Sequence, residues 1–299
     1  FTPYSWEERS SMQRQFHLNY LVLAMIAIAS TRSLALAADP PVASTKLPLI
    51  VAHRGASYDA PENTLAAFNL AWKQGADAIE GDFFLSQDGH LVCIHDKDTK
   101  RFTGKQLVVN NTPLATLQKL DVGSWKDKKF ASERIPTIGE VFATIPAGKK
   151  IFVELKEGAR IVAPLKLAIS RSGLKRDQIV IISFKADAIA ESKQQLPRIR
   201  AHWLHSYKKD TKTGKYKNDL EQIVRTLKDT KADGLGTQGN QEIVTRQFLD
   251  ALRQAGMQEF SVWTINEPAE AHYFRALGTV AITTDRPGYL RRTLGHPTP

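Results

Sequence analysis

From residue 49 onward, short apolar or β-branched runs alternate with longer segments in which apolar positions recur every three or four residues. The short runs predict strands, and the longer segments predict helices. The predicted strands are 49–53, 76–84, 150–155, 178–184, 199–205, 232–236, 260–264 and 280–283. The predicted helices are 63–74, 138–145, 161–170, 186–195, 220–229, 245–255, 268–277 and 288–294. Eight strand–helix pairs predict an α/β fold, a (β/α)8 TIM barrel over residues 49–295.

One strand-like run, 90–95, lies outside this alternation. Only the segment Ser86-Gln87-Asp88-Gly89 separates it from the second strand, whereas a parallel crossover needs about a dozen residues. The Asp88-Gly89 pair is typical of a tight turn. We therefore expect 90–95 to fold back as a hairpin arm. With the residues up to about 134 it would form an insertion after strand two, about 86–134.

Three carboxylates occur near the ends of neighbouring predicted strands. Glu80 and Asp82 lie two residues apart and so point to the same face of the second strand, and Glu154 lies near the end of the third. The ends of barrel strands are where barrel active sites lie. Three carboxylates in a dry site repel each other unless a cation lies between them. Hard oxygen ligands favour Mg²⁺ or Ca²⁺ over zinc.

Two histidines and two cationic residues accompany these carboxylates. His53 and His95 are the residues best suited to move protons near neutral pH. Arg54 and Lys156 supply positive charge for an anionic substrate. With a divalent metal, these groups indicate hydrolysis of a phosphate ester.

The ordered motifs resemble those of a known family. They are His53-Arg54-Gly55, Pro61-Glu62-Asn63-Thr64, Glu80-x-Asp82, His95-Asp96, Glu154-Leu155-Lys156, Trp263-Thr264-Ile265-Asn266 and Thr284-Asp285-Arg286-Pro287. From about residue 49 to about 290 the chain resembles the glycerophosphodiester phosphodiesterases. The resemblance implies a metal-dependent barrel enzyme that splits deacylated phospholipids into sn-glycerol 3-phosphate and an alcohol. It also implies an insertion after strand two.

The resemblance assigns a role to each candidate residue. The metal ligands are Glu80, Asp82 and Glu154, the general acid and base are His53 and His95, and the substrate-binding residues are Arg54, Lys156 and Trp263. The metal would be one Mg²⁺ or Ca²⁺ ion. Which histidine is the acid and which the base stays open. Lys156 either stabilises charge or only pairs with Glu154, and Trp263 either walls the pocket or packs in the core.

Three further positions keep two interpretations each. Asn63 either caps the first helix or belongs to the site. Glu62 would orient Arg54 or the metal ligands. Asp285 either acts in the site or braces the last strand.

Two other functions stay open beside the preferred one. A lysophospholipase D or a sphingomyelinase D-like enzyme would use the same metal and histidines on an acylated substrate, which needs an apolar groove. Apolar residues of the insertion that could build one are Phe102, Leu107, Val108, Val109 and Trp125. A non-catalytic module that binds phosphorylated headgroups would be marked by loss of a histidine or metal ligand, and all five are present.

The segment before the barrel is typical of an exported protein. A mildly basic start at Met12, an apolar run over 18–28 and the small-x-small triplet Ala35-Leu36-Ala37 predict a secretory signal peptide. We expect a leader over 1–37, a linker over 38–48, and a protein that is periplasmic or secreted. The single cysteine, Cys93, can form no internal disulfide, so we expect it to pack in the fold.

The chain is basic, with a formal net charge of +10 at pH 7. This charge serves solubility, or it attracts anionic substrates and weakly binds an anionic membrane. Nucleic acid is not an expected partner, because no aromatic-basic recognition motif is present. The expected partner is a small-molecule glycerophosphodiester, and the oligomeric state stays open.

Overall fold

The computed structural model describes residues 47–217 and 219–296. Eight parallel strands within them close into a barrel, in the order β1-β9-β8-β7-β6-β5-β4-β2 with β2 paired back to β1. These strands are β1 (Leu49–Ala52), β2 (Ala78–Leu85), β4 (Lys150–Leu155), β5 (Ile179–Ser183), β6 (Arg200–His205), β7 (Gly234–Gln238), β8 (Glu259–Trp263) and β9 (Ala281–Thr284). The predicted TIM barrel is therefore confirmed.

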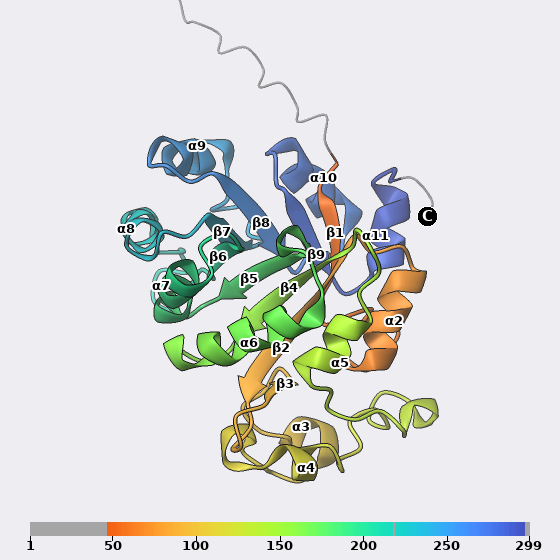
Figure 1. Cartoon of the computed structure of the whole chain (residues 1–299). Coiled ribbons are helices and arrows are strands. Elements are labelled where there is room, and N and C mark those ends of the chain that lie inside the picture. The colour runs from red at the N-terminus through yellow and green to blue at the C-terminus, as the bar shows by residue number, and fades with distance from the viewer. Residues whose placement is uncertain (1–46, 218, 297–299) are drawn as a thin grey trace, which may run out of the picture. The chain divides into compact units, whose positions relative to one another are not determined.

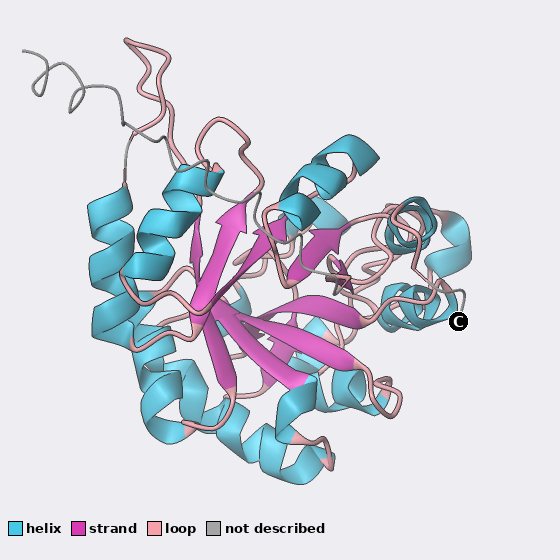
Figure 2. Cartoon of the chain, turned by 90° about the horizontal axis from the view of Figure 1, so that it is seen from above, coloured by secondary structure: helices cyan, strands magenta, loops and turns pink. Residues whose placement is uncertain are grey.

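A principal helix follows each barrel strand and covers the outside of the barrel (Figures 1 and 2). These helices are α2 (Leu65–Lys73), α5 (Ile138–Ala143), α6 (Val162–Ser172), α7 (Ala186–Gln195), α8 (Leu220–Thr230), α9 (Arg246–Gln254), α10 (Pro268–Ala276) and α11 (Pro287–Thr293). Each overlaps its predicted segment, with ends that differ by at most two residues. The periodicity of apolar positions was sufficient because these helices bury one stripe against the strands.

The core has two layers because side chains alternate along each strand. Outward-facing residues such as Ile50 and Ile151 pack beneath the helices in the main hydrophobic cluster. Inward-facing residues such as Val51, Phe152 and Ile182 form a separate cluster inside the barrel. The polar residues nearer the strand ends lie next to this inner cluster.

The insertion begins with a hairpin, as predicted. Its strand β3 (Leu91–Cys93) pairs antiparallel with the end of β2, with Phe83 opposite Cys93. It continues through α3 (Lys100–Thr103) and α4 (Leu114–Leu117), which lie together beside the end of β2 (Figure 1). Phe102 and Val109 are buried in a small core of the insertion itself. They therefore do not line an open groove, whereas Val108 and Trp125 are 37% and 42% exposed.

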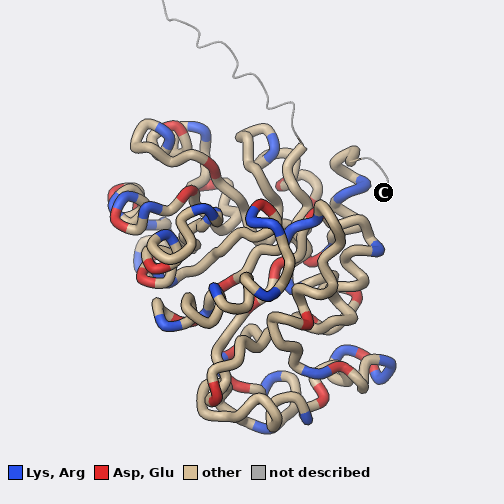
Figure 3. Tube along the Cα trace, in the orientation of Figure 1, with Lys and Arg blue, Asp and Glu red and all other residues tan. Residues whose placement is uncertain are grey.

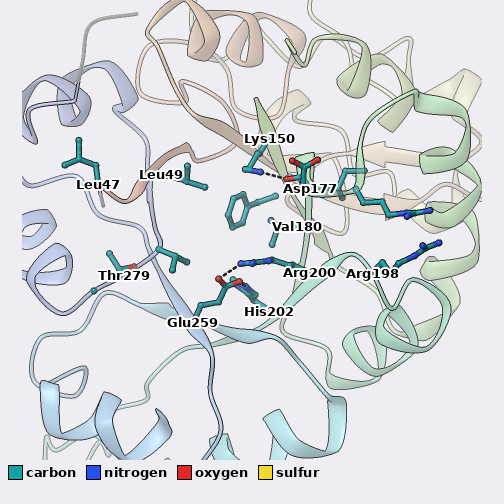
Figure 4. Close-up of a pocket in the computed structure, with 15 residues that line it drawn as sticks. Leu47, Leu49, Lys150, Asp177, Val180, Arg198, Arg200, His202, Glu259 and Thr279 are labelled. Atoms are coloured by element: carbon teal, nitrogen blue, oxygen red, sulfur yellow. Dashed lines mark hydrogen bonds and ion pairs between the residues drawn. The ribbon is translucent and has the colours of Figure 1, made fainter. Parts of the chain in front are cut away.

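The end of the barrel where the strands begin holds a cavity of about 460 Å³ (Figure 4). Inside it Glu259 accepts a hydrogen bond from His202 Nε2 at 2.9 Å and forms an ion pair with Arg200. The cavity contains none of the predicted site residues. Phe152 lines it from one side and lines the pocket at the other end of the barrel as well.

Basic and acidic positions are interspersed over the helices and the insertion (Figure 3). No helix among residues 47–217 and 219–296 has the length and apolar character needed to cross a membrane. The predicted leader, 1–37, and the linker up to residue 46 lie outside the described residues.

Candidate active site

The three predicted metal ligands converge on the inner face of the barrel. β2 and β4 pair in a register that puts Asp82 directly beside Glu154, and Glu80 lies two residues before Asp82 on the same face. One oxygen from each carboxylate lies within 4.8 Å of the others, and all three residues are buried. Strand pairing alone therefore builds the acidic cluster.

Two cations partly neutralise this cluster. Lys156 Nζ lies 2.7 Å from Glu154 Oε1 and 3.1 Å from Asp82 Oδ1, and Arg54 Nε lies 3.2 Å from Asp82 Oδ2. Although burial opposes ionisation, Lys156 and Arg54 hold the pKa of Asp82 below its usual range. Burial and the Asp82 charge raise the pKa of Glu80 well above its usual value and that of Glu154 to about 7.

The donor set fits a hard divalent cation. Glu80 Oε2 accepts a hydrogen bond from the Arg54 backbone N–H at 2.9 Å, but Glu80 Oε1 is buried with no hydrogen-bond partner among the described residues. A buried carboxylate oxygen without a donor is costly unless a cation takes that place. Asn63 donates to Asp82 Oδ2 at 2.8 Å and so fixes one of the other carboxylates.

A carboxylate holds each of the two predicted catalytic histidines. His53 Nδ1 lies 2.7 Å from Asp285 Oδ1. Asp285 also accepts hydrogen bonds from Ser57 Oγ at 2.9 Å and Asn266 Nδ2 at 2.7 Å. Despite burial, these donors and His53 lower the pKa of Asp285 to about 2, so it is ionised at neutral pH.

His95 is held in the same way by its neighbour Asp96, with 2.7 Å between Nδ1 and Oδ1. A carboxylate on Nδ1 favours the tautomer that carries its proton there, which leaves Nε2 free to exchange a proton with a substrate. Burial lowers the pKa of His95 from 6.5. His95 is therefore largely neutral near pH 7 and able to accept a proton.

Except for Asp82, every predicted site residue lines one pocket of about 200 Å³. Its ionisable lining is His53, Arg54, Glu80, His95, Glu154 and Lys156, and the hydroxyl residues Ser261, Thr264 and Thr283 line it as well. Its apolar lining is Phe152, Ile182, Phe184, Leu204 and Trp263. The rings of Phe184 and Trp263 meet edge to face at 5.4 Å, and Trp263 Nε1 is buried with no hydrogen-bond partner in the described part of the chain. The pocket therefore combines a charged lining with an aromatic wall.

The interpretation of Asn63 as the cap of the first helix is wrong. Thr64 is the N-cap, and its hydroxyl accepts a hydrogen bond from the Ala67 N–H at 3.3 Å. Asn63 has a left-handed backbone with φ of 58°, a conformation that asparagine tolerates better than most residues. That conformation turns its side chain toward Asp82 rather than toward the helix.

Glu62 and Asp285 both contact the site. Glu62 Oε1 accepts a hydrogen bond from Arg54 Nη1 at 2.8 Å, which matches the interpretation that it orients this arginine. Asp285 holds His53 instead of only bracing the last strand. The sequence reasoning missed Asp96 as the partner of His95, and Arg101, which binds both Asp96 and Glu62. The motif His95-Asp96 was the available signal for Asp96, whereas no motif marked Arg101.

A barrel that brings two carboxylate-held histidines, two cations and an acidic cluster into one small pocket has the groups needed by a hydrolase acting on a phosphoric diester. Comparison with known proteins defines the family within this class. Residues 53–289 match the model of the glycerophosphoryl diester phosphodiesterase family, and the chain belongs to that family. Its members are phosphoric diester hydrolases.

Individual relatives agree with this family. A glycerophosphodiester phosphodiesterase of Caldanaerobacter subterraneus is 37% identical over 163 residues, which are 52% of this chain and 66% of that protein. A Mycobacterium tuberculosis protein named probable glycerophosphodiester phosphodiesterase 1 is 30% identical over 81% of this chain and 90% of its own length. A phosphodiesterase of Oleispira antarctica, solved with its product sn-glycerol 3-phosphate, is 28% identical with a TM-score of 0.73. That match covers 83% of this chain and 97% of the other.

Proposed function

We propose that this protein is a metal-dependent phosphodiesterase that hydrolyses glycerophosphodiesters to sn-glycerol 3-phosphate and an alcohol. The observation that carries the proposal is the pocket shared by His53, His95 and the acidic cluster. The relative from Oleispira antarctica with bound sn-glycerol 3-phosphate supports a substrate of this class. Glu80, Asp82 and Glu154 would hold one Mg²⁺ or Ca²⁺ ion. When bound, such an ion supplies positive charge for the phosphoryl oxygens.

The histidines carry the proton transfers. One takes the proton of the nucleophile, which is water or the substrate's own hydroxyl, and the other protonates the leaving alkoxide. Each has its Nδ1 bound to a carboxylate, so both His53 and His95 have the geometry for either role. Acid–base catalysis of this kind is worth about 10²–10⁴-fold in rate.

The cations bind the phosphate. Arg54 lines the pocket, and Glu62 and Asp82 hold its guanidinium in place before substrate arrives. Lys156 is bound to Asp82 and Glu154, so it reduces the negative charge that an anionic substrate would meet. Phe184 and Trp263 form the wall for the glycerol or alcohol group.

A small soluble diester suits this pocket better than an acylated substrate. The pocket is about 200 Å³, and drug-sized ligands occupy clefts of roughly 300–1,000 Å³. Phe102 and Val109, two apolar residues that an acyl groove would have used, pack inside the insertion. Both histidines keep their carboxylate partners, which a binding module without catalysis would not require.

We also propose that the protein is exported to the periplasm or secreted. The support is the sequence of the leader alone, with its apolar run over 18–28 and the triplet Ala35-Leu36-Ala37. Weak binding to an anionic membrane is proposed from the net charge of +10. Amino-terminal sequencing of the exported protein would test the leader, since a product that keeps residues 1–37 contradicts cleavage.

The function is tested by release of sn-glycerol 3-phosphate from glycerophosphocholine, with chelator and after readdition of Mg²⁺ or Ca²⁺. We expect release that needs the metal and disappears in His53→Ala. His272→Ala, at an exposed position of α10, is the matched control and should keep full activity. A folded protein that releases nothing with either metal, or that cleaves only lysophosphatidylcholine, would contradict the proposal.

A further inference from the structure

Arg101, on the short helix α3 of the insertion, binds two carboxylates that come from different parts of the chain. Its Nε donates to Asp96 Oδ2 at 2.6 Å. Its Nη1 and Nη2 donate to Glu62 Oε2 at 3.0 Å and to Glu62 Oε1 at 2.8 Å. One guanidinium thus makes three charge-assisted hydrogen bonds, two of them to a single carboxylate.

Each of these carboxylates also holds a residue that lines the pocket. Asp96 uses its other oxygen, Oδ1, to bind His95 Nδ1 at 2.7 Å. Glu62 Oε1 accepts a second hydrogen bond, from Arg54 Nη1 at 2.8 Å. The result is one connected series of side-chain contacts in the order His95, Asp96, Arg101, Glu62, Arg54.

We propose that Arg101 is a positioning residue that fixes the histidine of the insertion relative to the phosphate-binding arginine of the barrel. The inference rests on the roles of His95 and Arg54 in the proposed function. Among the described residues, the hydrogen bonds of the Arg101 side chain go to Asp96 and Glu62 and not to these two residues, and Arg101 does not line the pocket. It acts through Asp96 and Glu62 only.

An ordinary exposed ion pair would not carry this role, because solvent screens it and it holds its side chains only weakly in place. The surroundings of Arg101 differ from that case. Its side chain is 43% exposed, but the side chain of Glu62 is only 12% exposed. The guanidinium also lies 4.1 Å from the centre of the Phe102 ring, and Phe102 belongs to the small core of the insertion. The planar guanidinium therefore packs against an aromatic ring on one face and is hydrogen-bonded along its edges.

The shape of the side chain matters as well as its charge. A guanidinium is planar and presents its donors in a fixed fork, which matches two carboxylates at once. A lysine at this position keeps the charge but offers a single ammonium group on a flexible stem. Arg101→Lys therefore separates geometry from charge, and Arg101→Gln removes both the charge and the fork.

The kinetic test compares these two variants with Lys100→Gln, which removes one positive charge from the neighbouring exposed position. We expect kcat/KM for glycerophosphocholine to fall about 10- to 100-fold in Arg101→Lys and in Arg101→Gln, mainly through kcat, since misplaced catalytic groups cost rates of this order. Lys100→Gln should match the wild type. In a third variant, Arg101→Ala, added guanidinium ion should partly restore kcat/KM, whereas added ammonium ion should not.

Asp96→Asn supplies the second kinetic arm. If Arg101 acts through Asp96, the combined variant Asp96→Asn with Arg101→Gln loses less than the product of the two single losses. Multiplicative losses, or variants of Arg101 within about twofold of the wild type, would overturn the proposal. A twofold change lies within what the loss of an ordinary exposed ion pair produces.

A measurement without substrate separates this proposal from the proposed function. The ¹⁵N resonances of the His95 imidazole report its tautomer and its titration, and those of His53 serve as an internal reference. We expect Arg101→Gln to raise the pKa of His95, because a positive charge is lost and Asp96 is no longer shared. The chemical shifts of the reference resonances should match those of the wild type. A response at His95 in a protein without diesterase activity would keep the positioning role and contradict the function. Unchanged His95 resonances would overturn the positioning role.

Discussion

His53 Nδ1 and Asp285 Oδ1 are 2.7 Å apart, although the two residues are 232 positions apart in the sequence. The reason is the closure of the barrel. β1 and β9 are neighbouring parallel strands, and Ala52 pairs with Thr284, so the next residue of each strand stands at the same edge. The first and last strands together thus build one histidine–carboxylate pair, and the insertion supplies the other.

Asp285→Asn should therefore reduce activity without unfolding the protein. The amide keeps the shape of the carboxylate but loses the charge that holds the His53 imidazole in place. We expect kcat for glycerophosphocholine to fall about 100-fold, with KM changed much less. Asp250→Asn, at an exposed position of α9, is the matched control. A kcat equal to that of the wild type would mean that His53 needs no carboxylate partner.

The lowered pKa of Asp285 predicts that the folded protein loses stability in acid. The pKa of Asp285 is about 2 in the folded protein, below its ordinary value of 3.8. A lowered folded-state pKa contributes stability that is present above the unfolded-state value and is lost as the pH falls through the folded-state value. The wild type should thus be more stable than Asp285→Asn above about pH 4, and this advantage should shrink toward about pH 2. Urea unfolding of both proteins across this pH range measures the difference in their free energies of unfolding. A difference that does not change with pH would contradict the lowered pKa of Asp285.

The pattern of apolar and polar positions was sufficient to predict most of the fold, because the strands of the barrel are buried on both faces. The run 179–183 is apolar except for its last residue, 150–155 has an apolar centre between Lys150 and Glu154, and the helix between them shows one apolar stripe. β7 was predicted at 232–236 but is Gly234–Gln238. Two glycines in this strand leave Leu235 as its only large apolar residue, so its pattern could not fix the ends.

The site was predictable in its residue types but not in all of its partners. Asn63 and Thr64 are both good helix caps, so the sequence could not choose between them. The partner of His53 depends on the closure of the barrel. Arg101 lies in an exposed insertion, where an arginine usually faces solvent, and only the three-dimensional structure shows its two carboxylates.

Metal should stabilise the protein through the acidic cluster. A ligand that binds only the folded state at one hundred times its Kd adds about 2.7 kcal/mol, which corresponds to a Tm increase of about 5 °C or more. Glu80→Gln should abolish this response to Mg²⁺ or Ca²⁺. It should also raise Tm in chelator, because one of three mutually repelling buried carboxylates becomes neutral.

The control for this response is Glu242→Gln, whose side chain is 71% exposed and lies in a loop. It should show the same increase in Tm as the wild type when metal is added. A Glu80→Gln protein that still responds to the metal would place the ion elsewhere.

Trp263 gives a prediction in which activity and stability change in opposite directions. Its Nε1 is buried and has no hydrogen-bond partner in residues 47–217 and 219–296, and it lines the pocket that holds both histidines. An unpaired buried N–H costs about 1–3 kcal/mol, so its presence is explained if the substrate provides the acceptor. Trp263→Phe keeps an aromatic ring against Phe184, and it removes this donor together with one ring of the indole. We expect kcat/KM to fall about tenfold, the equivalent of one hydrogen bond of about 1.4 kcal/mol, and stability to stay equal or rise.

Trp72→Phe is the matched control, because the indole N–H of Trp72 already donates to Thr144 Oγ1 at 3.3 Å on the outside of the barrel. This variant loses a satisfied hydrogen bond far from the pocket, so its free energy of unfolding should fall by about 1 kcal/mol while kcat/KM stays at the wild-type value. Steady-state kinetics and urea unfolding of the two variants form the comparison. If Trp263→Phe were as active as the wild type, the indole N–H would have no acceptor on the substrate, and Trp263 would act as an apolar wall alone.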